Sequence, residues 1–318
     1  SGLMSSSGPP SDSHKANSSW APFLSPEQNQ QFDQLVLAYF KAEGIPITLD
    51  SGIVTSEQEG LGPFGLQNLA QLCAQAPADK WQAIIHAHFN NLRRGQVEAT
   101  ELGEQITNFE RVKTHIAVRI YPQDMFAQEA LAEMIYRQDL EGTLTVLVLD
   151  LPSTIRTLPR PMTSTWGKTD QELIDIGIAN LGQHLDFDHE KVMMSEDLYL
   201  NAYIGEGYYV AAYSLMLEKV EKELGRYGAL VGIPHRHMLL TYPIHDIQVL
   251  QAINGFLMAL PKLYQEGPGS ITPNLYWYNQ GGYLPLPYAY HDDEIRFSPP
   301  QAFLDLIEVL KPPEETVH

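Results

Sequence analysis

The sequence predicts an α+β protein with a mixed, largely antiparallel sheet, helices packed on that sheet, and an N-terminal helical extension. Three observations carry this prediction. Strand and helix patterns alternate along the chain after residue 109, which is typical of layered architectures. Apolar runs at 228–233 and 237–242 flank a short polar turn, which predicts an antiparallel hairpin. Residues 25–108, in contrast, carry mostly helical periodicity.

The N-terminal part is expected to comprise a disordered segment and a helical unit. Residues 1–24 are rich in Ser, Gly and Pro and poor in apolar residues, which is typical of disorder. A helix is predicted to begin at Ser25-Pro26, because Ser favours the N-cap and Pro the first turn, and to end at Gly44. A strand at 47–54 and helices at 65–75 and 78–94 complete the unit over 25–108.

The second part, 109–318, is expected to form the α+β domain. Strands are predicted at 113–120, 143–150, 190–203, 228–233 and 237–242. Helices are predicted at 125–137, 169–183, 207–224 and 246–264, and the helix at 169 begins with a capping box formed by Thr169 and Glu172. A second hairpin with a turn at Gly281-Gly282 and a final helix from Ser298 to before Pro312 follow.

The composition excludes several classes of partner. The chain of 318 residues has 39 Asp and Glu against 20 Lys and Arg, a net charge of −19 that would repel a phosphate backbone. Nucleic acid and anionic membrane surfaces are therefore not expected as partners. No apolar run approaches the ~20 residues of a membrane helix, no signal-peptide pattern is present, and the single cysteine, Cys73, lies on an apolar helical stripe. We expect a soluble cytoplasmic protein in which Cys73 is a core residue.

Four groups of residues in the second part form a recognisable pattern: Leu149–Arg156, Trp166–Leu173 with Ala179–Leu181, Leu230–Leu240, and Gly267-Pro268 with Ile271–Tyr276. Together they resemble the YtpQ-like family of bacterial proteins, whose activity is not established. The resemblance covers roughly residues 109–310, although the family more often has Asn and Asp where this chain has His235 and His237. It implies a bacterial, cytoplasmic α+β protein and assigns no functional residue.

The turn of the first hairpin is the main candidate site, since it carries His235, Arg236 and His237. Positions i and i+2 of a strand face the same side, so both imidazoles could reach one ion, with His291 as a third ligand. The competing interpretation is that these three residues form an ordinary polar turn that is solvated at the end of the hairpin and binds no ligand. No metal or other cofactor is expected under the second interpretation, and zinc is the metal expected under the first.

Aromatic residues gather in the second hairpin: Tyr276, Trp277, Tyr278 and Tyr283. Aromatic faces beside Asn279 suit stacking on a ligand or a peptide. The alternative is that one face of the hairpin packs on the core, because side chains alternate along a strand. The first interpretation predicts one open recognition surface formed by the 235–237 turn and the 276–290 aromatics.

The function expected from these observations is a non-enzymatic intracellular binding or interaction protein, with a protein or peptide as partner. The sequence contains neither a phosphate-binding glycine loop nor a GxSxG motif, so an enzyme is not favoured. The alternative is a metal-dependent hydrolase that uses His235 and His237. The sequence leaves the oligomeric state and the ligand open.

Overall fold

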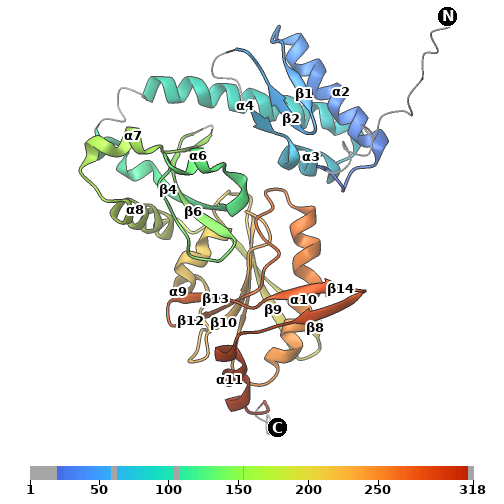
Figure 1. Cartoon of the computed structure of the whole chain (residues 1–318), viewed down its shortest axis with the longest axis vertical. Coiled ribbons are helices and arrows are strands. Elements are labelled where there is room, and N and C mark those ends of the chain that lie inside the picture. Colours follow the sequence, from blue (N-terminus) through green and yellow to red (C-terminus); the bar gives the residue numbers. More distant parts are fainter. Residues whose placement is uncertain (1–19, 59–62, 103–107, 153, 314–318) are drawn as a thin grey trace, which may run out of the picture. The chain divides into compact units, whose positions relative to one another are not determined.

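The computed structural model describes residues 20–58, 63–102, 108–152 and 154–313, with only the backbone described for 95–102. The chain separates into two compact units, 1–96 and 97–318, and the division falls within the helix α4. Each unit is shown in Figure 1 and has a hydrophobic core of its own. No helix within the described ranges is long and apolar enough to cross a membrane.

The N-terminal unit packs three helices with a small sheet. Helix α2 (Pro26–Ala42) begins where expected, with a capping box in which Ser25 and Gln28 bond each other's backbone amides. Helices α3 (Gln67–Ala74) and α4 (Trp81–Leu102) follow. The sheet contains β1 (Thr48–Asp50), β2 (Ile53–Thr55) and β3 (Phe64–Gly65), so the single strand expected at 47–54 is instead a hairpin.

The core of this unit corrects the prediction of disorder for residues 20–24 and confirms the predicted burial of Cys73. Ala21 and Leu24 are buried in it and Trp20 packs on Phe32, so residues 20–24 are ordered, and the remainder of the segment expected to be disordered lies outside the described residues. Cys73 is fully buried as expected, and burial raises the pKa of its thiol to about 12.

The C-terminal unit confirms the predicted α+β class and its largely antiparallel pairing, since every ladder between the described strands is antiparallel. Its strands form two main sheets in place of one mixed sheet. The smaller sheet has the order β4-β6-β5, with β7 also paired to β6. Its strands are β4 (Ile116–Pro122), β5 (Tyr136–Arg137), β6 (Thr143–Asp150) and β7 (Ile155–Thr157).

The larger sheet has six strands in the order β13-β12-β10-β11-β9-β8. They are β8 (Asp188–Ser195), β9 (Leu198–Ile204), β10 (Ala229–Gly232), β11 (Met238–Pro243), β12 (Tyr276–Asn279) and β13 (Gly282–Pro285). The predicted hairpin of β10 and β11 is confirmed, with Leu230 opposite Tyr242. The strand expected at 190–203 is instead the hairpin of β8 and β9.

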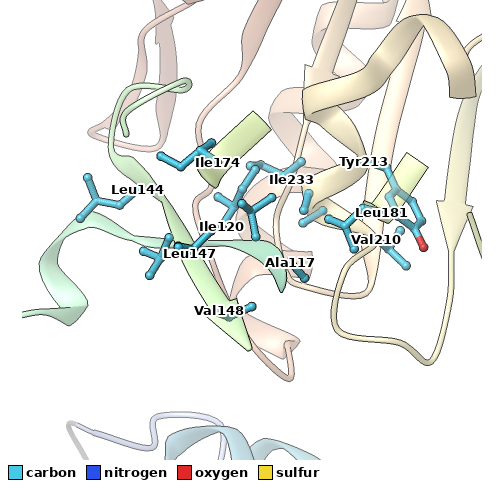
Figure 2. Packing of buried hydrophobic residues seen from close by; sticks show 14 of the residues in the cluster. Ala117, Ile120, Leu144, Leu147, Val148, Ile174, Leu181, Val210, Tyr213 and Ile233 are labelled. Atoms are coloured by element: carbon cyan, nitrogen blue, oxygen red, sulfur yellow. The ribbon is translucent and has the colours of Figure 1, made fainter. Parts of the chain in front are cut away.

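Alternation along β10 gives the larger sheet two buried faces, because successive side chains point to opposite sides. Ala229 and Val231 join the cluster shared with the smaller sheet, and Figure 2 shows Ile120 and Leu147 of that sheet together with Ile233 among the side chains of this cluster. Leu230 faces the other way, toward helix α10 (Val249–Glu266), which lies along the sheet in Figure 1.

Helix α8 (Asp170–Gln183) covers the smaller sheet and begins with the predicted Thr169–Glu172 capping box. It approaches β4 closely at Gly177, where a Cβ would meet Val118 at 2.9 Å. The final helix α11 (Gln301–Val309) places Phe303 against Trp277. The paired strands β14 (Tyr288–His291) and β15 (Glu294–Phe297) form a separate hairpin that the sequence patterns did not indicate.

Two predicted helices are wrong. The segment 125–137 holds the short helix α6 (Gln128–Leu131) and then β5, preceded by the 3₁₀ turn η3 (Gln123–Met125). The segment 207–224 holds the 3₁₀ helix η5 (Ala211–Met216) and α9 (Leu217–Val220). Ala211 and Tyr213 of η5 are buried in the shared cluster, so tertiary packing overrides the helical periodicity there.

Candidate functional site

The turn between β10 and β11 is held by neighbouring loops and is not a free hairpin end. The amide of Arg236 donates to the carbonyl of Gly269 at 3.0 Å, and the amide of Ile271 donates to the carbonyl of Pro234 at 2.9 Å. The amide of Ala211 donates to the carbonyl of Arg236 at 3.2 Å. His235 is only 7% exposed. The expectation of an open, solvent-facing turn is therefore wrong, because the 269–271 loop and the segment at Ala211 both bond to it.

The hydrogen bonds of His237 define its tautomer. Its Nδ1 lies 3.0 Å from the carbonyl oxygens of both Gly205 and Gly207, which only accept, so Nδ1 carries the proton. Its Nε2 accepts from Nε of Arg236 at 3.0 Å, since a guanidinium only donates. Burial and the charge of Arg236 lower the pKa of His237, which keeps this ring neutral at pH 7.

His235 is also neutral and also occupied. Its Nδ1 accepts from the backbone amide of His237 at 3.2 Å, so the remaining proton is on Nε2. Burial, followed by the nearby His237 and Arg236, lowers the pKa of His235 to about 4. The lone pairs of both rings are thus used inside the fold.

This arrangement does not support the predicted metal site. A metal ion needs the nitrogen lone pairs that already accept from His237 N and Arg236 Nε, and the charge of Arg236 would repel a cation. His291 lies on the exposed hairpin of β14 and β15, opposite Glu294. No group of three or more His, Cys, Asp or Glu in the described part of the chain could hold a metal.

Arg236 belongs instead to a pair of arginines that share one aromatic ring. The guanidinium carbon of Arg236 lies 4.6 Å from the ring centroid of Tyr208, and that of Arg119 lies 5.3 Å from the same centroid. Arg119 also lies 4.7 Å from the ring of Tyr121. Both are cation–π distances. The two guanidinium carbons are consequently no more than about 10 Å apart, on β4 and on the β10–β11 turn.

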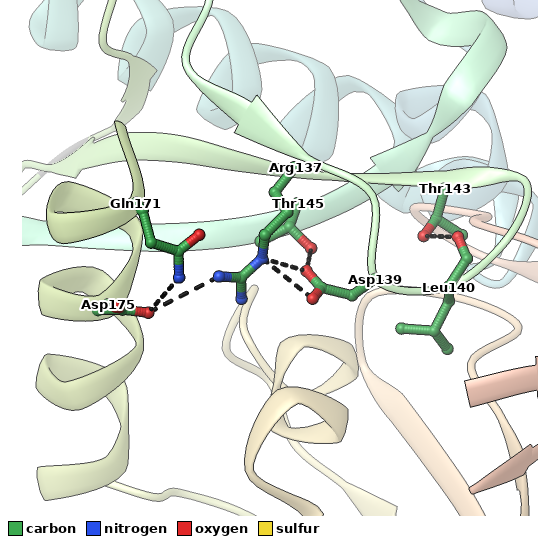
Figure 3. Close-up of polar contacts among 7 residues, drawn as sticks. All are labelled: Arg137, Asp139, Leu140, Thr143, Thr145, Gln171 and Asp175. Carbon is green, nitrogen blue, oxygen red and sulfur yellow. Dashed lines mark hydrogen bonds and ion pairs between the residues drawn. The ribbon is translucent and has the colours of Figure 1, made fainter. Parts of the chain in front are cut away.

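No ion pair among the described residues includes Arg119 or Arg236. Arg137, on the same sheet as Arg119, shows the usual alternative: Figure 3 shows it between Asp139, 3.0 Å from its Nε, and Asp175, 3.7 Å from its Nη1. Burial first, and the charge of Arg119 second, lower the pKa of Arg236 to about 10. The Arg119–Arg236 pair is therefore a partly buried positive site without an ion-paired carboxylate among the described residues, although the Asp150 carboxyl lies close enough to Arg119 to feel its charge.

Two polar atoms beside the pair have no hydrogen-bond partner in the described structure. They are Nε of Arg119 and the hydroxyl of Tyr209, both buried. The Tyr209 hydroxyl lies near Asp150, and burial raises the pKa of that carboxyl while Tyr209, His115 and Arg119 oppose the rise. The Tyr209 hydroxyl has the Asp150 carboxylate as a nearby acceptor, whereas Nε of Arg119 is a buried donor without one in the described structure. Such donors are rare and costly, so Nε of Arg119 indicates a place where a bound group could accept a hydrogen bond.

The aromatic residues of β12 and β13 do not join this site. Val231 of β10 pairs with Tyr276 and Ala229 pairs with Tyr278, so the turn that follows Tyr278 lies at the opposite end of β10 from His235. The hydroxyl and indole groups of these residues bond to backbone carbonyl groups of the fold. Tyr276 donates to the carbonyl of Glu141, Trp277 to that of Tyr227 at 2.8 Å, and Tyr283 to that of Ser214 at 2.7 Å. The expectation of one surface joining the turn and the aromatics is wrong.

A cavity of about 460 Å³ opens at that opposite end and includes Glu221 in its lining. Glu221 is only 3% exposed, and its Oε2 accepts from Thr241 at 2.6 Å, Tyr203 at 2.9 Å and Asn201 at 3.0 Å. These three donors come from β11 and β9. Glu221 therefore connects α9 to the sheet as a structural hydrogen-bond centre.

Comparison with protein-family models, curated proteins and solved structures gives no match to this chain. The resemblance to the YtpQ-like family stays a prediction, and the site must be interpreted from its own residues. Sequence reasoning found Arg236 but missed Arg119, Tyr208 and Tyr209. One signal was present, since Arg119 interrupts the apolar run Ile116–Ile120, where a charged residue is rare unless it has a partner or a role.

Proposed function

We propose that this chain is a non-enzymatic binding protein whose ligand carries a negatively charged group held by Arg119 and Arg236. The observation that carries the proposal is that both guanidinium groups lie against Tyr208 without a carboxylate partner among the described residues. Guanidinium groups form strong bidentate hydrogen bonds with carboxylate and phosphate.

The energetic argument concerns the unliganded site. Two like charges no more than about 10 Å apart repel each other by on the order of 1 kcal/mol at an effective dielectric constant near 20, after allowance for solvent screening. Arg236 also loses hydration through burial. An anion bound between the arginines would reverse both costs, so the preformed site favours a negatively charged ligand.

The two histidines support a binding role over catalysis. The imidazole of His237 accepts from Arg236 and donates to Gly205 and Gly207, which holds the guanidinium in one orientation. A ring whose two nitrogen atoms are both occupied in this way is poorly suited to accept a proton from a substrate. His237 thus acts as a positioning residue for Arg236 in this proposal, and His235 supports His237 by accepting from its backbone amide.

The chain's overall charge limits the size of the anion. A net charge of −19 opposes any extended polyanion, whereas a local pair of arginines still attracts a small anionic group. A small molecule or an acidic segment of a protein or peptide partner meets this condition, and nucleic acid does not. We place the protein in the cytoplasm because its one cysteine is a buried thiol, which needs no oxidising compartment.

The test is thermal stabilisation of the full chain by small anions at constant ionic strength. Inorganic phosphate, citrate, succinate and acetate are compared, and ligand at about 100 times its Kd should add about 2.7 kcal/mol to stability. Arg236→Gln and Arg119→Gln should abolish the shift. Arg296→Gln removes the same charge from an exposed position of β15 and should leave the shift intact. The proposal is wrong if no anion stabilises the protein, or if all three variants respond alike.

A further inference from the structure

We propose that the anionic group is a phosphate monoester in its dianionic form, held between the free edges of the Arg236 and Arg119 guanidinium groups. This inference rests on the proposed function and narrows its ligand class. It follows from the number and placement of the unused donors at the Arg119–Arg236 pair, and from the charge that the pair leaves uncompensated.

The first step is the orientation of Arg236. Its Nε is already used by His237 at 3.0 Å, so the remaining donors are the two terminal nitrogens, for which the described residues offer no hydrogen-bond acceptor. The side chain also lies directly over Gly269, where a Cβ would come within 2.4 Å of its Cδ. The terminal edge of the guanidinium is thus fixed from two sides and presents two parallel donors.

The second step is the complementary edge of Arg119. Its buried Nε has no hydrogen-bond partner in the described structure, and its guanidinium carbon lies on the same Tyr208 ring at 5.3 Å. A side edge of Arg119 and a terminal edge of Arg236 together offer about four N–H donors, which would use every lone pair on the two oxygens of a carboxylate. A phosphate monoester has three terminal oxygens, each of which accepts hydrogen bonds.

The third step is charge. Arg119 and Arg236 bring two positive charges, and neither has an ion pair with a described residue. A carboxylate or a phosphodiester would neutralise one of these charges. A phosphate monoester carries about −1.5 to −2 at neutral pH and can neutralise both. The site should therefore discriminate a dianion from a monoanion of similar shape.

The experiment is isothermal titration of the full chain at pH 7.5 and fixed ionic strength. The probes are methyl phosphate, inorganic phosphate, dimethyl phosphate, acetate and succinate. We expect methyl phosphate to bind at least tenfold more tightly than dimethyl phosphate, acetate and succinate. Arg236→Lys keeps the charge but removes the paired donors, so it should reduce the preference for methyl phosphate over dimethyl phosphate to less than threefold.

The outcomes separate this inference from the proposed function. Tighter binding of succinate than of methyl phosphate, lost in Arg236→Gln, would overturn the phosphate inference and leave the anion-binding function standing. Absence of binding by every probe, or binding that survives both Arg119→Gln and Arg236→Gln, would overturn both. Circular dichroism and the thermal midpoint establish that each variant is folded.

Two further probes distinguish the sources of the phosphate group. A short phosphoserine peptide that binds at least tenfold more tightly than methyl phosphate would support the inference and identify a phosphorylated protein as the partner. Equal affinity for the peptide and methyl phosphate would support it with a small phosphorylated molecule as the ligand. Weaker binding of methyl phosphate than of dimethyl phosphate would contradict the inference whatever the peptide does.

Discussion

Nε of Arg236 donates a hydrogen bond to Nε2 of the next residue, His237, over 3.0 Å. Because His237 is itself fixed by the carbonyl oxygens of Gly205 and Gly207, the arginine is linked through it to the loop that follows β9. The imidazole must stay neutral for this bond to exist, and burial beside Arg236 favours that state.

Gly269→Ala should displace Arg236 and abolish anion binding. The new Cβ would lie 2.4–2.8 Å from three side-chain atoms of Arg236, and the backbone φ of +75° is strained for alanine. Gly281→Ala is the matched control, since its φ is +79° and nothing lies within 4 Å of its Cβ. Urea unfolding should show about 1–2 kcal/mol of destabilisation for the control and about 1–3 kcal/mol more for Gly269→Ala. Equal costs and intact anion binding in both variants would contradict this prediction.

Stability should fall as the pH drops from about 6.5 to about 4, because of His235. Its folded pKa of about 4 lies below its ordinary value of 6.5, so the unfolded chain binds a proton in this window and the folded chain does not. The neutral state of His235 contributes fully to the free energy of unfolding above pH 6.5. At most about 3 kcal/mol of this free energy is lost when the pH reaches 4.

His235→Asn isolates this effect. An Asn side chain can accept from the amide two residues on, as Nδ1 of His235 does from His237, without titrating. Urea unfolding at pH 7.0 and 4.5 should show about 2 kcal/mol less acid destabilisation in the variant than in the parent protein. The same acid sensitivity in both proteins would show that other groups are responsible.

The sequence predicts those elements of this structure that are specified by residues close together in the chain. The capping box at Thr169 and the hairpin of β10 and β11 were predicted because a few neighbouring residues specify them. The segment 207–224 was expected to be one helix from its apolar spacing, yet Ala211 and Tyr213 are buried between the two sheets in a 3₁₀ turn. That packing involves contacts from distant parts of the chain, which local periodicity cannot indicate.

The site illustrates the same limit. Arg236 was identified because it stands between two histidines in a polar turn, but its partners Arg119 and Tyr208 lie far away in the sequence and meet it only through the sheet arrangement. His235 was expected to be exposed, since a turn between strands usually is. The 267–271 loop covers that turn through two backbone hydrogen bonds, one at Gly269 and one at Ile271. The sequence patterns of the loop and of the turn did not predict that the two segments pair.

Glu221→Ala should be among the most destabilising single substitutions of the C-terminal unit. It would leave Thr241, Tyr203 and Asn201 as buried donors without their acceptor. Each unsatisfied buried group costs about 1–3 kcal/mol, so a loss of at least about 3 kcal/mol is expected in urea unfolding. Glu218→Ala removes a carboxylate that, among the described residues, accepts from Tyr278 alone at 3.3 Å, and it should cost less than about 1 kcal/mol. Similar losses in the two variants would contradict the central role of Glu221.

Arg119→Met should keep or raise stability while it abolishes anion binding. The substitution retains an apolar stem on β4 but removes a charge that repels Arg236 and a buried Nε that has no acceptor in the described structure. Loss of the cation–π contacts with Tyr121 and Tyr208 offsets part of this gain. We therefore expect a net gain of only about 0–1 kcal/mol in the free energy of unfolding, and no stabilisation by phosphate.

Arg137→Met provides the comparison, because the guanidinium of Arg137 is paired with Asp139 and Asp175. Its loss should destabilise the protein by about 1–2 kcal/mol without affecting phosphate binding. If Arg119→Met were the more destabilising of the two and phosphate still bound, Arg119 would be a structural residue, and the positive pair would not be a ligand site.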